Sequence, residues 1–146
     1  MTIRSSTGLR NAMLATGSFK EVMDAGSEIR VYAGTVPADA DAAIGGATLL
    51  LTIRKDGTDP ITMDAAASAG VLVKNPAETW EGNCVATGTP TFYRHVLTGD
   101  TGAASTTAPR QQGSCGPAGS DMFLTNSGLT NGAPQGLDYY EVALPA

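Results

Sequence analysis

Few side chains in this chain of 146 residues could do chemistry, and they are far apart in the sequence. His95 is the only histidine, so it is the only imidazole base available. Cys84 or Cys115 could serve as a nucleophile, with Asp100 or Asp121 as the acid that orients the base. Neither cysteine sits at a recognisable elbow or helix N-terminus, where a thiol pKa is lowered. We therefore expect His95 to be a packed or surface strand residue, no residue to be catalytic, and the chain not to be an enzyme.

Metal and cofactor sites need ligands at short, regular spacings, and the sequence lacks them. One histidine and two distant cysteines cannot complete a structural zinc site without carboxylates, and no CxxC or HxxxH spacing occurs. The spacing of Asp39 and Asp41 resembles a calcium loop without its glycine and distal glutamate. Residues 113–119 are rich in glycine, but Pro117 and the strand-like residues after it exclude the helix of a phosphate loop. The sequence predicts no metal and no cofactor.

The net charge of −5 restricts the partners that the chain can bind. Lys and Arg are scattered singly, with no cluster beyond Arg54 and Lys55, whereas nucleic-acid binders gather basic residues on one face. We therefore expect no direct contact with nucleic acid and no electrostatic attachment to a membrane. No run approaches the about 20 apolar residues of a membrane span, and no secretory h-region is visible. These features favour synthesis in a reducing cytoplasm, where the two cysteines remain buried thiols.

Composition and patterning predict an all-β fold. Glycine is abundant at 18 residues, and aromatic residues make up only 5%, which suits short strands joined by many turns. About eight to nine short strands are expected, at residues 27–34, 47–54, 61–63, 71–74, 78–86, 92–97, 110–115, 121–125 and 137–144. This spacing is typical of a jelly-roll-like β-sandwich or barrel. We predict one β-sandwich domain over residues 27–146, preceded by an N-terminal helix and arm over residues 1–26.

The stretch 84–97 gathers two aromatic residues, the histidine and an arginine, and we expect it to anchor the core. Gly88 predicts a turn that joins it to the strand containing Trp80, so that the two form a central hairpin. Large side chains should hold together a protein that is otherwise made of small residues. The predicted core anchors are Trp80, Phe92, Val96, Phe123 and Tyr140.

The N-terminal 26 residues predict a short helix with one small apolar face. Residues 5–7 offer a cap, Leu9 and Met13 are neighbours one turn apart, and Gly17 ends the helix. Residues 18–26 are compatible with a second helical turn or with irregular structure. This segment either plugs one end of the sheet or acts as an arm that docks on a neighbouring subunit. The side chains expected to contact a partner are Leu9, Met13, Phe19 and Val22.

Motifs along most of the chain resemble a family of small virion proteins encoded among the head genes of tailed bacteriophages. They are GLRNAM at 8–13, EIRVYAGTVP at 28–37, ADADAA at 38–43, TLLLTI at 48–53, GTPTFYR at 88–94 and GPAGSDMFL at 116–124. The resemblance implies a jelly-roll-like sandwich and the role of a capsid decoration or cement protein. Such proteins sit on the capsid exterior after assembly in the host cytoplasm. They brace neighbouring copies of the major capsid protein, often as homo-oligomers that are symmetric dimers or trimers.

Two other functions remain open from the sequence. One is a tail, collar or receptor-binding module of the virion that recognises a glycan or a host surface, which exposed aromatic residues in a loop-rimmed groove would favour. The other is a small hydrolase that uses Cys84 and His95. We rank the cement protein first, because binding at many symmetry-related places builds avidity from modest contacts.

Overall fold

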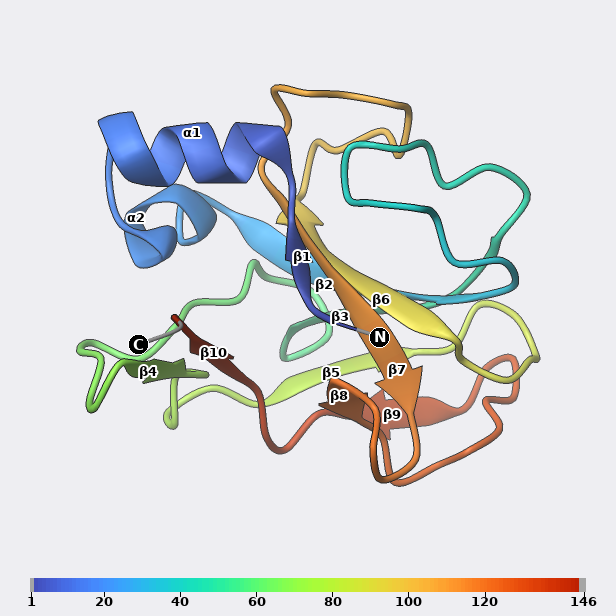
Figure 1. The fold of residues 1–146 in the computed structure, drawn as a ribbon. Coiled ribbons are helices and arrows are strands. Elements are labelled where there is room, and N and C mark those ends of the chain that lie inside the picture. The colour runs from blue at the N-terminus through green and yellow to red at the C-terminus, as the bar shows by residue number, and fades with distance from the viewer. Residues whose placement is uncertain (1, 145–146) are drawn as a thin grey trace.

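Ten short strands and two helices form the described part of the chain, residues 2–144 of a computed structural model (Figure 1). Strand accounts for 37% of the chain and helix for 10%, so the predicted all-β, sandwich-like class is confirmed. In chain order the elements are β1 (Arg4–Ser5), α1 (Thr7–Ala15), α2 (Phe19–Met23), β2 (Ser27–Ala33), β3 (Thr48–Lys55), β4 (Val71–Val73), β5 (Trp80–Asn83), β6 (Phe92–Leu97), β7 (Arg110–Gly116), β8 (Met122–Phe123), β9 (Pro134–Gly136) and β10 (Glu141–Ala143).

One large sheet carries most of the strands, in the order β1-β7-β6-β2-β3-β5-β9. These neighbours pair in antiparallel fashion, while the short strand β8 runs parallel to β7. Strands β10 and β4 form a separate antiparallel ribbon. The middle of the sheet is buried on both faces, because five of the six β6 residues are buried and β7 is nearly as inaccessible. A second layer must therefore cover each face of β2, β6 and β7.

The predicted central hairpin is wrong. Strand β5, which contains Trp80, pairs with β3 and β9, whereas β6 pairs with β2 and β7. The connecting residues run across the ends of the strands that lie between, since the Val85 N–H binds the Leu50 carbonyl and the Thr91 N–H binds the Tyr32 carbonyl. Residues 84–91 are thus a crossover and not a tight turn.

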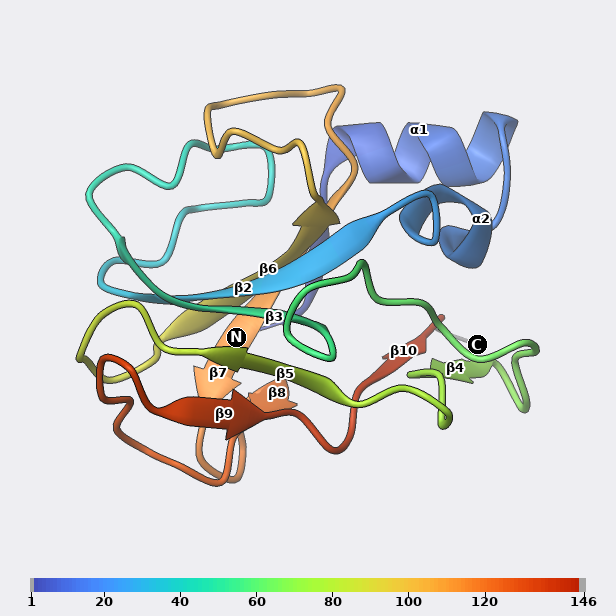
Figure 2. The same cartoon turned by 180° about the vertical axis from the view of Figure 1, so that it is seen from behind.

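The two faces of the central strands have different chemistry. Ile29, Val31 and Tyr93 turn toward the main apolar core. On the opposite face, Phe92 stacks on Tyr32 with the ring centroids 5.0 Å apart, and Arg94 donates to carbonyls of the loop that follows β2. The fold is therefore a sandwich in which loops take the place of part of one layer (Figures 1 and 2).

Four of the five predicted core anchors are buried, and one is exposed. Trp80, Phe92, Val96 and Tyr140 retain at most 4% of their accessible surface. Phe123 is 54% exposed, so its assignment to the core was wrong. The reason is strand alternation: Met122 and Leu124 take the inward positions around β8, and the residue between them points to solvent.

The N-terminal helices pack on the sheet above the β4–β10 ribbon (Figures 1 and 2). The Ser6 hydroxyl accepts the Leu9 N–H and caps α1, and Ser18 forms a capping box with Glu21 at the start of α2. Leu9 and Phe19, two of the four residues expected to contact a partner, are buried and belong to the core cluster. The other two arm residues, Met13 and Val22, are partly buried and pack against it.

Close backbone contact between β5 and β3 makes Gly82 sensitive to substitution. A Cβ at this position would lie 2.1 Å from the Thr52 carbonyl oxygen, so the two strands would have to separate. We expect Gly82→Ala to lower the free energy of unfolding by about 1–3 kcal/mol, the usual cost of overpacking. Gly128→Ala is the matched control, because its Cβ would meet nothing within 4 Å. Equal urea midpoints for the two variants would contradict the tight packing.

Candidate functional site

The side chains proposed for catalysis do not form a site. The backbone of Cys84 forms an isolated β-bridge with Leu51 of β3. Strands β3 and β2 therefore separate Cys84 from His95 on β6. Cys115 lies on β7 and is also buried. Burial raises the pKa of Cys84 and raises that of Cys115 to about 12, so both thiols stay protonated near neutral pH. A thiolate nucleophile has no support at either position.

A consequence is that the native protein should not react with thiol reagents. Both cysteines are 3% exposed, and neither is in a disulfide. We expect no reaction with Ellman's reagent at pH 8 over minutes, and two reactive thiols per chain after denaturation. One fast thiol in the folded protein would contradict the buried, protonated state of that cysteine.

His95 belongs to a buried chain of hydrogen bonds. Its Nε2 atom lies 2.8 Å from the Ser27 hydroxyl, and its Nδ1 atom lies 3.2 Å from the Tyr140 hydroxyl. Tyr140 donates to Gln111 Oε1 at 2.9 Å, so its oxygen is left to accept the proton on Nδ1. The arrangement fits a neutral imidazole with a proton on Nδ1 that accepts from Ser27 at Nε2. The sequence had not indicated Ser27 or Gln111, because the alternation of residues does not show which distant side chains meet.

This serine and histidine pair resembles a catalytic dyad in distance but not in environment. Ser27 and His95 are at most 1% exposed, and the Phe19 ring contacts the imidazole edge-on at 5.8 Å. Burial lowers the pKa of His95 to about 3, far below the value at which a general base works at neutral pH. The cluster therefore holds the sheet, the C-terminal segment and α2 together.

A metal site is also missing from the described residues: within residues 2–144, no group of three or more His, Cys, Asp or Glu side chains could hold an ion. The Asp39 and Asp41 carboxylates serve the fold instead. Asp39 accepts the N–H groups of Asp41 and Ala42, which closes a turn. Asp41 accepts both the N–H and the hydroxyl of Thr7, and these bonds lower its pKa.

The most unusual feature is a layer of buried and half-buried polar side chains beneath two long loops. We call residues 34–47 and 98–109 the loop platform, and Arg30, Arg94, Arg110 and Gln112 the arginine layer. Arg94 and Gln112 are fully buried at neighbouring positions of β6 and β7, and the Arg94 Nε donates to Gln112 Oε1 at 2.8 Å. Arg110 is 1% exposed. The loops thus cover buried polar side chains as well as the Tyr32 and Phe92 rings.

The first loop of the platform turns its carbonyl groups toward this layer. Arg94 Nη2 donates to the carbonyls of Asp39 and Ala42 at 3.1 and 2.8 Å. Gln112 donates to the Pro37 carbonyl at 2.9 Å, and Arg110 to that of Ala40 at 3.3 Å. Four carbonyls of this loop, those of residues 37, 39, 40 and 42, thus accept hydrogen bonds from buried side chains of the arginine layer.

The second loop is held by an ion pair and by the same donors. Arg110 and Asp100 form a salt bridge with 2.6 Å between Nε and Oδ2, and both side chains are almost fully buried. Arg110 also donates to the Ala103 carbonyl at 2.8 Å, and Arg30 to that of Asp100 at 2.7 Å. The two loops bind each other through the Ile44 N–H and the Gly102 carbonyl, 2.9 Å apart. The platform is therefore one connected unit, at the upper right of Figure 1.

Charge is unevenly balanced within the arginine layer. Arg110 is paired with Asp100, and Arg30 and Arg54 share the carboxylate of Glu28. Arg94 has only neutral acceptors, and within residues 2–144 its Nη1 atom has no hydrogen-bond partner. Burial and the nearby Arg110 charge lower the pKa of Arg94.

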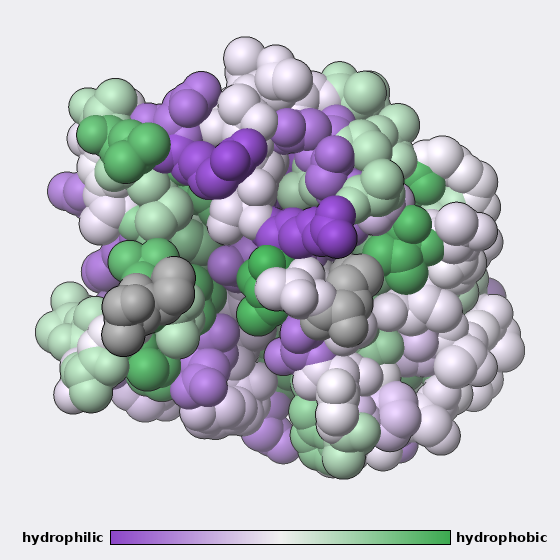
Figure 3. All heavy atoms as spheres, in the orientation of Figure 1, coloured by the Kyte–Doolittle hydropathy of each residue, from purple (hydrophilic) through white to green (hydrophobic). Residues whose placement is uncertain are grey.

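The outer surface of the platform is built from small residues. Alanine, glycine, serine and threonine dominate both loops, and residues such as Ala43, Ala103 and Ala104 are exposed. In Figure 3 this region is mostly white and pale green, which marks hydropathy near neutral. Rigid backbone under short side chains gives a surface that another protein can approach closely.

Comparisons with protein-family models, curated proteins and solved structures found no match. No helix in residues 2–144 is long and apolar enough to cross a membrane.

Proposed function

We propose that the chain is a non-enzymatic virion structural protein that binds the outer surface of a phage capsid and cements neighbouring major capsid proteins. The observation that carries this proposal is the loop platform, whose backbone is fixed by buried arginines and whose surface is made of small residues. A cement protein needs a contact surface that is already ordered, because ordering loops on binding costs affinity. The resemblance of the sequence to capsid decoration proteins of tailed phages suggests the major capsid protein as the partner.

Rigid loops also fit repeated binding on a lattice. Many copies on one shell, as dimers or trimers, combine modest contacts into strong attachment. The net charge of −5 keeps such a protein from sticking to packaged nucleic acid. The arrangement on the capsid exterior and the oligomeric state belong to the proposal.

The test uses heads of the parent phage produced without this protein. Purified protein should sediment with the heads and raise the temperature at which they release DNA. Ala104→Arg places a long charged side chain on the platform, and should weaken this binding at least tenfold. Ala77→Arg, also at an exposed alanine but away from the platform, is the matched control. Wild-type protein that stays in the supernatant, or heads equally stable without it, would refute the cement role.

A second candidate, a glycan-binding module of the tail or collar, has one observation in its favour. A groove of about 560 Å³ runs beside β4 and β5 and is lined by Lys74, Glu81 and Tyr139, among others. Tyr139 is 66% exposed, so its ring is free to stack on a sugar. Binding on a glycan array that Tyr139→Ala abolishes and Phe123→Ala leaves intact would favour this function over the first.

A further inference from the structure

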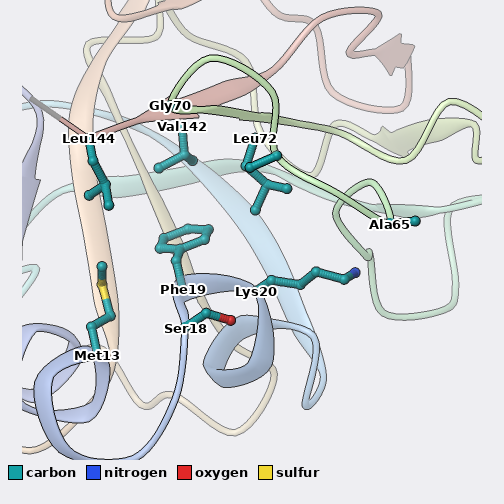
Figure 4. Close-up of a pocket in the computed structure, with 10 residues that line it drawn as sticks. Met13, Ser18, Phe19, Lys20, Ala65, Gly70, Leu72, Val142 and Leu144 are labelled. Atoms are coloured by element: carbon teal, nitrogen blue, oxygen red, sulfur yellow. The ribbon is translucent and has the colours of Figure 1, made fainter. Parts of the chain in front are cut away.

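An apolar groove of about 490 Å³ lies between the N-terminal helices and the β4–β10 ribbon. Phe19 of α2, Leu72 of β4 and Val142 of β10 point into this groove (Figure 4). Leu144, the residue after β10, also lines it. Met13 of α1 closes one end. Apolar side chains from four elements thus face a volume that the described chain leaves open.

The strand beside this groove has an unused edge. The Lys74 N–H donates to the Tyr140 carbonyl and the Leu144 N–H donates to the Gly70 carbonyl, at the two ends of β4. Between them Val142 is opposite Leu72. In an antiparallel pair the intervening residues turn their N–H and C=O groups the other way, so those of Glu141 and Ala143 point away from β4. Within residues 2–144, β10 pairs with no strand on that side, and both residues are exposed. A free strand edge therefore adjoins an apolar groove.

We infer that this edge binds an extended segment of a partner protein, which adds a third strand to the β4–β10 ribbon. Main-chain hydrogen bonds to Glu141 and Ala143 would hold the segment, and its alternate side chains would face the same side as Val142 and enter the groove. The unpaired edge specifies a strand as the occupant. An apolar groove alone would not.

Size and charge define the segment further. Ten residues line the groove, whereas a stable interface between two folded proteins uses roughly 20–30 residues a side, so the site fits a single inserted segment. Glu141 faces away from the groove and is exposed, and a basic residue opposite it on the added strand would form a favourable cross-strand pair. The segment therefore has apolar residues at alternate positions and a Lys or Arg between them. This surface is separate from the loop platform, and its test does not depend on the capsid role.

The test uses the purified chain and a synthetic peptide, acetyl-Gly-Val-Lys-Val-Thr-Val-Gly-amide. The peptide should shift the amide resonances of Glu141 and Ala143 and slow their hydrogen exchange. A second peptide with Glu in place of Lys should bind at least tenfold more weakly. No change at these two amides would overturn the inference. Slow exchange that depends on protein concentration without any peptide would also overturn it, because a second copy would then occupy the edge.

Two variants separate the strand edge from the rest of the groove. Ala143→Pro removes one outward N–H, which proline on an edge strand tolerates, and should reduce peptide affinity at least tenfold with an unchanged circular dichroism spectrum. If the proline variant does not fold, Leu144→Asp takes its place in the test and should also weaken peptide binding. Val85→Asp is its control, because Leu144 and Val85 are 63% and 59% exposed. Wild-type affinity in Ala143→Pro or Leu144→Asp would contradict binding along β10.

Discussion

Replacing Arg110 with alanine is expected to lower the free energy of unfolding by about 3–5 kcal/mol, the usual cost of removing one partner of a buried ion pair. Asp100 would lose its ion-pair partner at a site where its side chain is 4% exposed, and the carbonyls of Ala40 and Ala103 would lose their donor. The loss should appear in urea unfolding. Hydrogen exchange should show faster opening of residues 98–103 before the rest of the sheet.

The controls for this variant separate burial from charge. Arg10→Ala removes an exposed arginine with a single side-chain hydrogen bond, to Thr7, and should change stability by no more than about 0.5 kcal/mol. Asp100→Ala together with Arg110→Ala should cost less than the sum of the single variants, because no charge is then left buried alone. A loss for Arg110→Ala as small as that of the control would mean that the arginine layer does not hold the platform.

The protein should also lose stability in mild acid through His95. Its pKa is about 3 in the folded chain, whereas the ordinary value of a solvated histidine is 6.5, so the unfolded chain binds a proton that the folded chain does not. The contribution of the neutral His95 to the free energy of unfolding is therefore fully present above pH 6.5. It falls as the pH drops toward 3, by at most about 1.4 kcal/mol per pH unit. Between pH 7.5 and 5 the expected loss is about 2 kcal/mol.

Measurements above pH 5 separate the effect of His95 on stability from the effect of the carboxylates. The pKa values of Asp41 and Glu78 are lowered by hydrogen bonds that Thr7 and Thr62 donate, so these groups contribute to acid sensitivity only below about pH 5. Urea unfolding at pH 7.5 and at pH 5 should differ for the wild type, whereas His95→Gln should be less stable at both pH values and show little difference between them. The same pH dependence in both proteins would contradict a buried neutral His95.

The alternation of apolar residues predicted the strands that became β2, β3 and β6 well, because each has apolar neighbours on the core face. It could not predict which strands pair. The hairpin between the Trp80 strand and residues 92–97 followed from their closeness in sequence, yet β2 and β3 lie between them. Pairing depends on contacts between distant segments, and the short crossover at residues 84–91 looks like a turn in the sequence.

The candidate site was the least predictable part. Residues 110–115 are expected to form a strand, but the polar side chains of Arg110, Gln111 and Gln112 give no indication that β7 is among the most buried strands. Polar residues are usually exposed, but Arg110 and Gln112 are buried here and donate to carbonyls of the platform loops, while Gln111 accepts from Tyr140. An arginine or glutamine at alternate strand positions, as at Arg110 and Gln112, beside long loops of small residues, is the signal that would have indicated the layer.

A reconstruction of the parent virion tests the central proposal most directly. We expect density for this protein on the outside of the capsid, at the junctions between major capsid proteins, with residues 34–47 and 98–109 facing the shell. Density at the tail or collar, absence from the virion, or a platform that faces solvent while another surface makes the contacts would contradict the proposed function.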